Sequence, residues 1–154
     1  MKIRGRIAIG LAVVLVGACI VGAQERKIKR ADLPAAVEKT VAAESSGATI
    51  RGFSQEKENG KMHYEVEMTV NGRSKDVEMD ASGVILEVEE QVELDSLPAA
   101  VKAGLEAKAG KGKIMKVESL KKRDKLVAYE AKVETNGKKT EIQVGPEGQN
   151  VKHE

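Results

Sequence analysis

The five residues Leu33-Pro-Ala-Ala-Val37 decide the fold of this 154-residue chain, because they recur unchanged as Leu97-Pro-Ala-Ala-Val101, 64 positions later. Two further pairs recur at an offset of 65: Tyr64-Glu65 as Tyr129-Glu130, and Asn71-Gly72 as Asn136-Gly137. A long period that occurs only twice is typical of two copies of a small domain, since a solenoid normally needs three or more units. The sequence therefore predicts a duplication.

The repeated motif has the pattern of a short helix. Its apolar residues fall at i, i+3, i+4 and i+8, which places them on one helical face. They are Leu33, Ala36, Val37 and Val41 in the first copy and Leu97, Ala100, Val101 and Leu105 in the second. We expect Asp32 and Ser96 to be the N-caps, and Pro34 and Pro98 to lie in the first turn, where a missing N–H costs little. Gly47 and the pair Gly110 and Gly112 are the expected helix ends.

After each helix the period of the apolar residues changes from 3.6 to 2. In the first copy, alternate residues from Met62 to Val70 are apolar and the residues between them are polar. This pattern predicts a strand with one buried and one solvent-facing side, and Val127 to Val133 repeat it in the second copy. Ile50 and Phe53, like Ile114 and Val117, are three apart, which predicts a bulge in the first strand of each copy.

Turn signals complete the prediction of the fold. Asn-Gly pairs favour type I′ hairpin turns, because both central residues of that turn need a positive φ. They occur at Asn59-Gly60, Asn71-Gly72 and Asn136-Gly137, and Asp80-Ala-Ser-Gly83 and Gly145-Pro-Glu-Gly148 predict a further hairpin in each copy. The expected fold class is α+β, with two tandem repeats, each a short helix packed on a four-stranded antiparallel β-meander.

The expected domain boundaries follow from these patterns. Repeat 1 covers residues 33–90, a linker covers 91–96, and repeat 2 covers 97–154. A unit of about 60 residues is marginally stable alone, so we expect the two repeats to dock or to join their sheets edge to edge.

The N-terminus has the features of a secretory signal peptide over residues 1–23. A cationic start precedes a short apolar run, and small or β-branched residues lie before a cleavage site between Ala23 and Gln24. The charged segment 24–32 follows. Val16-Gly17-Ala18-Cys19 is an alternative signal, because it resembles the lipobox of bacterial lipoproteins with Cys19 as the lipidated residue. An uncleaved anchor helix is the third possibility. All three export the rest of the chain, so the expected location is the periplasm or the medium, or a lipid anchor in the envelope.

Charge and composition exclude several classes of function. The chain has 26 basic and 24 acidic residues, and three of the basic ones precede Ala23, so cleavage there leaves 23 basic and 24 acidic residues. A general nucleic-acid-binding protein is therefore not expected. Three aromatic residues and one cysteine also argue against a base-stacking surface, a disulfide scaffold and a cysteine-rich metal site.

The charges are divided between the repeats. Residues 33–96 hold 6 basic and 14 acidic side chains, whereas residues 97–154 hold 13 basic and 8 acidic ones. One interpretation is that the two halves attract and help to dock the repeats. The other is that a basic hairpin steers an acidic partner or anionic lipid headgroups. The candidate partner contacts are Lys121, Lys122, Arg123, Lys125, Glu65 and Glu67.

No residue pattern predicts catalysis. His63 and His153 have no partner suggested by spacing, and no nucleophile, metal-ligand or phosphate-binding pattern is found. Asp80-Ala-Ser-Gly83 is too short and too poor in carboxylates for a calcium loop. The sequence thus predicts a protein that is not an enzyme and has no cofactor, with Tyr64 and Tyr129 as core residues.

These motifs resemble the PepSY-like, or β-lactamase-inhibitor-like, family of exported bacterial proteins. The resemblance lies in Leu-Pro-x-x-Val, the Tyr-Glu pair, the Asn-Gly turn and the Asp80-to-Glu90 ending, and it covers both copies. The second copy departs from the pattern at Gly145 and at residues 149–151. The resemblance implies a non-catalytic module that binds a protein or peptide of the cell envelope, with inhibition of an exported hydrolase as a special case. The alternative is a structural or membrane-surface lipoprotein anchored through Cys19, which touches the membrane through its lipid or its basic second repeat.

Overall fold

A computed structural model of the chain describes residues 25–151. The predictions at Cys19, Ala23, Gln24 and His153 lie outside these residues. The first half contains, in order, β1 (Arg26–Ile28), α1 (Ala35–Glu44), β2 (Thr49–Glu58), β3 (Lys61–Val70), β4 (Arg73–Asp80) and β5 (Ile85–Val92). The second half contains α2 (Ala99–Ala109), β6 (Lys113–Lys122), β7 (Lys125–Thr135) and β8 (Lys138–Val144). The α+β class and the helix-then-meander order of the two repeats are confirmed.

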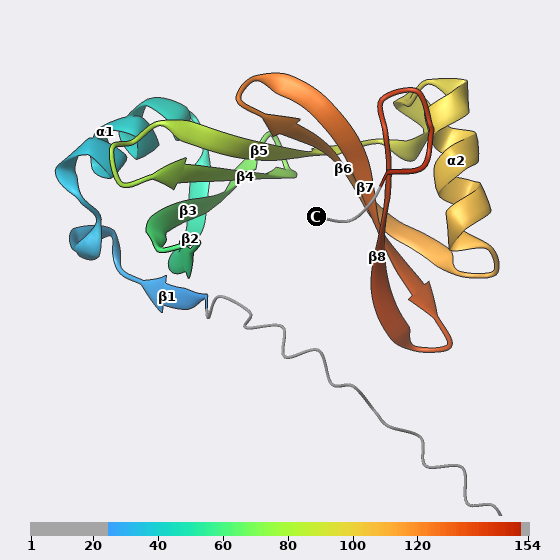
Figure 1. The fold of residues 1–154 in the computed structure, drawn as a ribbon, viewed down its shortest axis with the longest axis horizontal. Helices are drawn as coiled ribbons and strands as arrows, with labels where there is room; N and C mark the ends of the chain where they lie inside the picture. Colours follow the sequence, from blue (N-terminus) through green and yellow to red (C-terminus); the bar gives the residue numbers. More distant parts are fainter. Residues whose placement is uncertain (1–24, 152–154) are drawn as a thin grey trace, which may run out of the picture.

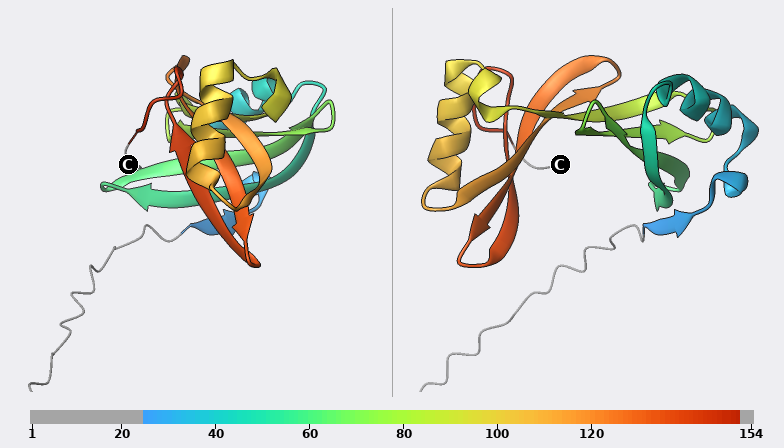
Figure 2. Two further views of the ribbon diagram at one scale, coloured as in Figure 1. Left: turned by 90° about the vertical axis from the view of Figure 1, so that its right-hand side faces the viewer. Right: turned by 180° about the vertical axis from the view of Figure 1, so that it is seen from behind.

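The eight strands form one antiparallel sheet in which each strand pairs with its neighbour in the chain. The two repeats are joined edge to edge by β5 and β6, whose register runs from Glu87 opposite Lys122 to Val92 opposite Val117. Figure 1 shows the two helices at opposite ends of an elongated molecule, with β5 and β6 between them. Seen along that length in Figure 2 (left), the strands of the second half cross those of the first, so the sheet is strongly twisted.

Each repeat has a core of its own. Under α1 the buried residues are Val37, Val41, Val66, Met68, Val77 and Met79, and under α2 they are Val101, Leu105, Val117, Ala131, Val133 and Val144. Tyr64 and Tyr129 pack against these two cores, as predicted. Neither helix among residues 25–151 is long and apolar enough to cross a membrane.

The local signals are confirmed at the turns and bulges. All three Asn-Gly pairs have a positive φ at both residues. The register shifts between Ile50 and Gly52 and between Ile114 and Lys116, where the spacing of the apolar residues predicts a bulge. The fourth strand of the second repeat is reduced to a single bridge between Val144 and Asn150, in the segment that departs from the family pattern.

The predicted N-caps are wrong. The helices begin after Pro34 and Pro98, which are the N-cap residues, and neither makes a side-chain capping bond. Asp32 instead accepts a hydrogen bond from the Lys29 N–H at 2.9 Å, and the Ser96 hydroxyl donates to the Glu93 carbonyl at 2.7 Å. Each of the two residues closes a short 3-10 turn, and the extended backbone of the proline that follows delays the helix by two residues.

Candidate functional site

Both helices cover the same face of the sheet. Val88 packs in the α1 core and Val92 in the α2 core, and both belong to β5. Since successive residues of a strand point to opposite faces, Glu87 and Glu89 point to the other side, together with their β6 partners Lys122 and Leu120. We call this side the helix-free face, because no helix of residues 25–151 packs against it.

Carboxylates lie directly opposite one another on the helix-free face. Glu65 of β3 is paired with Glu78 of β4, which is paired in turn with Glu87 of β5. A second row contains Glu67, Asp76 and Glu89. Like charges in directly opposed positions repel and destabilise a sheet. The first repeat therefore carries six acidic side chains across three adjacent strands in an arrangement that favours binding of a cation.

Two of these carboxyl groups have strongly raised pKa values. Burial, with smaller contributions led by Asp76, raises the pKa of Glu65 to about 7. Burial, followed by repulsion from Glu118 and Glu130, raises the pKa of Glu89 to about 8. Among residues 25–151, neither Glu65 nor Glu89 forms an ion pair. The alternation of apolar and polar residues predicts a solvent-facing side for these strands, but Glu65 and Glu89 on that side are only partly exposed.

Basic side chains near this face pair with other carboxylates. Arg51 contacts Asp76 at 3.0 Å, and Lys116 lies 2.5 Å from the Glu118 carboxylate. Glu118 is the most sheltered acidic side chain on the helix-free face, with 2% of it exposed, and it also accepts a hydrogen bond from the Ser74 hydroxyl at 3.3 Å. Glu118 therefore links β6 of the second repeat to β4 of the first.

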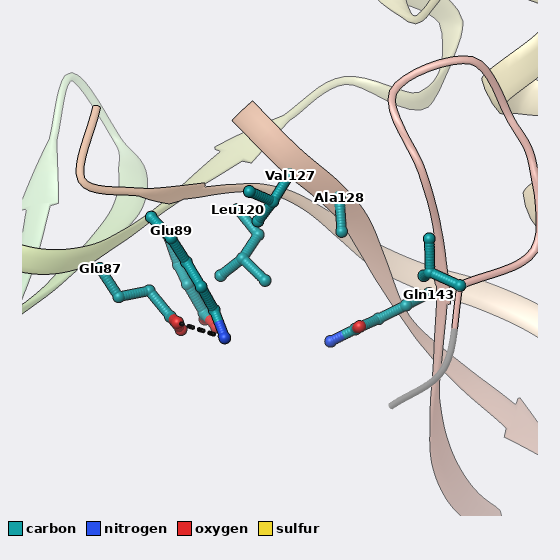
Figure 3. A pocket seen from close by; sticks show the side chains of 8 residues that line it. Glu87, Glu89, Leu120, Val127, Ala128 and Gln143 are labelled. Atoms are coloured by element: carbon teal, nitrogen blue, oxygen red, sulfur yellow. Dashed lines mark ion pairs between the residues drawn. The ribbon is translucent and has the colours of Figure 1, made fainter. Parts of the chain in front are cut away.

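A hollow of about 450 Å³ lies on the helix-free face where the repeats join. Leu120, Val127 and Ala128 form its apolar floor, and Glu87, Glu89, Lys122, Gln143 and Val151 complete its lining. Figure 3 shows Glu87 and Glu89 on one side of the hollow and Gln143 on the other, with its amide directed inward. An apolar floor beneath carboxylates suits a long side chain that ends in a positive charge.

A second hollow, of about 510 Å³, extends over the first repeat. Its lining includes Ser54, Glu65, Glu78 and Glu89 of the first repeat and Glu141 of β8. Because the last strand contributes to a hollow over the first repeat, the helix-free face is concave. Glu89 lines both hollows, so together they form one continuous acidic surface.

The predicted basic contacts are divided between the two sides of the sheet. Lys121 extends to the helix-covered side and pairs with Glu90 at 2.9 Å, while Lys122 lies 3.7 Å from Glu87 on the helix-free face. Arg123 is in the β6–β7 turn, and its N–H donates to the Leu86 carbonyl at 3.0 Å. Lys125 begins β7 opposite Lys122. Both lysine pairs cross from repeat 2 to repeat 1, which supports the interpretation that charge attraction helps to dock the repeats.

Sequence reasoning missed three parts of this face. Asp76, Glu118 and the partners of His63 come together only through strand pairing, and His63 lies beside Glu58 and Glu78. One sequence signal could have identified Asp76. The Asp80-to-Gly83 turn joins β4 to β5, so the alternating acidic residues of the two strands fall opposite one another. Of the candidates from the sequence, Glu65, Glu67 and Lys122 share the helix-free face, and Lys121 does not.

A protein-family model described as "Putative beta-lactamase-inhibitor-like, PepSY-like" matches residues 20–71 and again residues 62–151. The chain belongs to this PepSY-like family. The two matches together span both repeats, in agreement with the motifs that first suggested the resemblance. No curated protein matches the chain.

Solved structures of other bacterial proteins are similar in fold to this chain. A "BLIP-like protein" from Bacteroides fragilis is 23% identical with a TM-score of 0.54, and the match covers 77% of this chain and 82% of that one. A protein from Bacteroides eggerthii, described as one of the "putative periplasmic proteins", is 18% identical with a TM-score of 0.61, and the match covers 76% and 84% of the two chains. At these identities the likeness establishes the fold alone.

Proposed function

We propose that this PepSY-like protein is an exported, non-catalytic module that binds a cationic segment of another protein or peptide on its helix-free face. The observation that carries the proposal is the pair of sheltered carboxyl groups of Glu65 and Glu89, which have no ion-pair partner among residues 25–151. A bound positive charge would relieve the repulsion within the two carboxylate rows, because an opposite charge favours the ionised form of an acid.

The shape of the face supports a lysine or arginine side chain as the group bound. The hollow at the junction offers Leu120 and Ala128 to an aliphatic stem and the Glu89 carboxylate to its charged end, beside the Glu87 carboxylate that contacts Lys122 at 3.7 Å. Its volume of about 450 Å³ is within the range of ordinary ligand pockets. An extended basic peptide could place one side chain there and another over Glu65 in the adjoining hollow.

The family supports export and protein binding as parts of the same proposal. One relative is called BLIP-like and another is described as periplasmic, and residues 1–23 have the pattern of a signal peptide. Inhibition of an exported hydrolase is a special case in which the cationic segment belongs to that enzyme. The intact mass of the exported protein tests the N-terminus: a start at Gln24 supports cleavage by signal peptidase, whereas a lipid-modified Cys19 supports the lipoprotein.

A peptide titration tests the binding face. We expect fluorescence anisotropy to detect binding of a lysine- and arginine-rich peptide at low salt. Binding should be much weaker at 0.5 M salt, because salt screens charge attraction. The double variant Glu65→Gln/Glu89→Gln should bind at least about tenfold more weakly, the equivalent of about 1.4 kcal/mol. An uncharged peptide of the same length should not bind.

A matched control keeps the net charge of that variant and leaves the face intact. Glu106 on α2 and Glu147 in the loop beside α2 are both exposed and lie away from the carboxylate rows. Glu106→Gln/Glu147→Gln should therefore retain full affinity. Equal losses in the two double variants would mean that net charge alone attracts the peptide and would remove the helix-free face as the site.

A further inference from the structure

We infer that Glu58, His63 and Glu78 form a binding site for a divalent transition-metal ion, with Zn²⁺ the best match. The site lies on the helix-free face at the β2–β3 hairpin and shares Glu78 with the first carboxylate row. The inference does not depend on the cationic partner proposed above, because the ligand is a metal ion and only Glu78 is shared with the carboxylate rows.

Strand pairing brings the three donors together. The Nδ1 atom of His63 lies 2.5 Å from the Glu78 Oε1 atom and 3.3 Å from the Glu58 Oε2 atom. One donor atom from each residue lies within 4.8 Å of the other two. Glu58 ends β2 just before the tight Asn59-Gly60 turn, His63 follows that turn on β3, and Glu78 reaches the imidazole diagonally from β4. Three hydrogen-bonded strands therefore hold the ligands.

The carboxylates around His63 can accommodate one more positive charge. An imidazole Nδ1 carries at most one proton, so it can donate a hydrogen bond to only one of the two carboxylates at a time. Glu56 lies directly opposite His63 on β2 and adds a third carboxylate to the same corner. A metal ion at the centre of the trio would bind the Nδ1 lone pair and both oxygens at once.

The donor set favours zinc over calcium. Imidazole nitrogen is a common ligand of Zn²⁺, whereas Ca²⁺ takes six to eight oxygen ligands. Tetrahedral zinc at its usual bond lengths places its ligand atoms about 3.3 Å apart, so Nδ1 and the Glu78 oxygen need to separate by less than about 1 Å. The His63 side chain is 12% exposed and that of Glu58 is 53% exposed, which leaves a fourth position open to water.

Isothermal titration calorimetry of the purified protein with ZnCl₂ tests the site. We expect one Zn²⁺ per chain, and at least a tenfold loss of affinity in His63→Gln and in Glu58→Gln, since even outer-shell changes at metal sites cost 10–100-fold. Glu58 lies at an exposed hairpin end, so its variant reports on the metal even if His63→Gln perturbs the sheet. The ¹⁵N resonance of His63 Nδ1 should shift on addition of Zn²⁺ in the unmodified protein.

A control variant separates this site from the other cluster of acidic ligands on the same face. Asp76, Glu89 and Glu118 also bring three carboxylate oxygens together. Glu89→Gln should therefore leave Zn²⁺ affinity unchanged. The inference is overturned if Zn²⁺ does not bind, if His63→Gln and Glu58→Gln bind it as well as the unmodified protein does, if the affinity falls in Glu89→Gln instead, or if Ca²⁺ binds as tightly as Zn²⁺.

Discussion

Glu89 on β5 lies directly opposite Asp76 on β4, and both point to the face of the sheet that no helix of residues 25–151 covers. Asp76 is paired with Arg51 at 3.0 Å, whereas Glu89 has no basic partner among the described residues. Burial raises the pKa of both carboxyl groups. The ionisation of these two residues therefore affects both the stability of the sheet and the proposed binding of a cation.

The first prediction concerns the pH dependence of stability. The pKa of Glu89 is about 8 in the folded protein and 4.5 ordinarily, so between these values the folded state binds more protons than the unfolded state. The free energy of unfolding should then fall as the pH rises from about 5 to about 8. In urea titrations at pH 8, Glu89→Gln should be more stable than the unmodified protein by about 1 kcal/mol, a value reduced for the partial exposure of the side chain.

The control for this prediction is the same pair of proteins at pH 5. At pH 5 the folded-state carboxyl is protonated and the unfolded-state carboxyl is close to its ordinary pKa of 4.5, so the difference between the two stabilities should be much smaller than at pH 8. A constant difference between the two proteins at every pH from 5 to 8 would contradict a raised pKa.

The second prediction concerns the buried carboxylate that links the repeats. Glu118→Ala leaves Lys116 without its 2.5 Å partner and Ser74 without its acceptor, so it should lower the free energy of unfolding by about 3 kcal/mol. Glu141 is the matched control, because it is 50% exposed and contacts Lys132, which also pairs with Glu118. Glu141→Ala should cost less than about 1 kcal/mol. Similar losses in the two variants would show that Glu118 is not a structural link.

The third prediction concerns the β6–β7 turn. Arg123 and Asp124 both have a positive φ, of 49° and 64°, where the equivalent turn of repeat 1 has Asn59 and Gly60. Left-handed backbone costs most side chains roughly 1 kcal/mol, and Asn-Gly is the preferred pair for this turn. Arg123→Asn/Asp124→Gly should therefore raise the free energy of unfolding by about 1 kcal/mol. A loss of stability would mean that the two side chains make contacts worth more than the strain.

The fourth prediction concerns the loop that approaches α2. Gly148 has a φ of 79°, and a Cβ there would collide with the backbone of Ala100. Gly47 has a similar φ of 75° but open space around it. Gly148→Ala should lower the free energy of unfolding by about 3 kcal/mol and Gly47→Ala by about 1 kcal/mol, because only the first adds a steric clash to the strain. Equal losses in thermal or urea unfolding would argue against the close approach.

The sequence by itself determined the elements of this protein, because their signals are local. Asn71-Gly72 specifies its turn through two φ angles, and the three-residue spacing of Ile50 and Phe53 specifies a bulge within one strand. The N-caps were missed for a local reason too, since the short turn before each proline competes with the helix for Asp32 and Ser96. Period, turn chemistry and duplication were sufficient for the fold class and the family.

Only the tertiary structure decided which side chains are in contact and how strongly each one is desolvated. Ser74 and Glu118 are 44 residues apart and touch because β5 and β6 join the two repeats in one sheet. His63 acquires Glu58 and Glu78 in the same way, through hairpin register. The alternation of acidic residues places Glu89 on the side of the sheet away from the helices, but its desolvation depends on neighbours from both repeats that only the folded sheet brings together. Burial in the folded sheet raises the pKa of Glu89 to about 8, and the sequence pattern alone does not predict that burial.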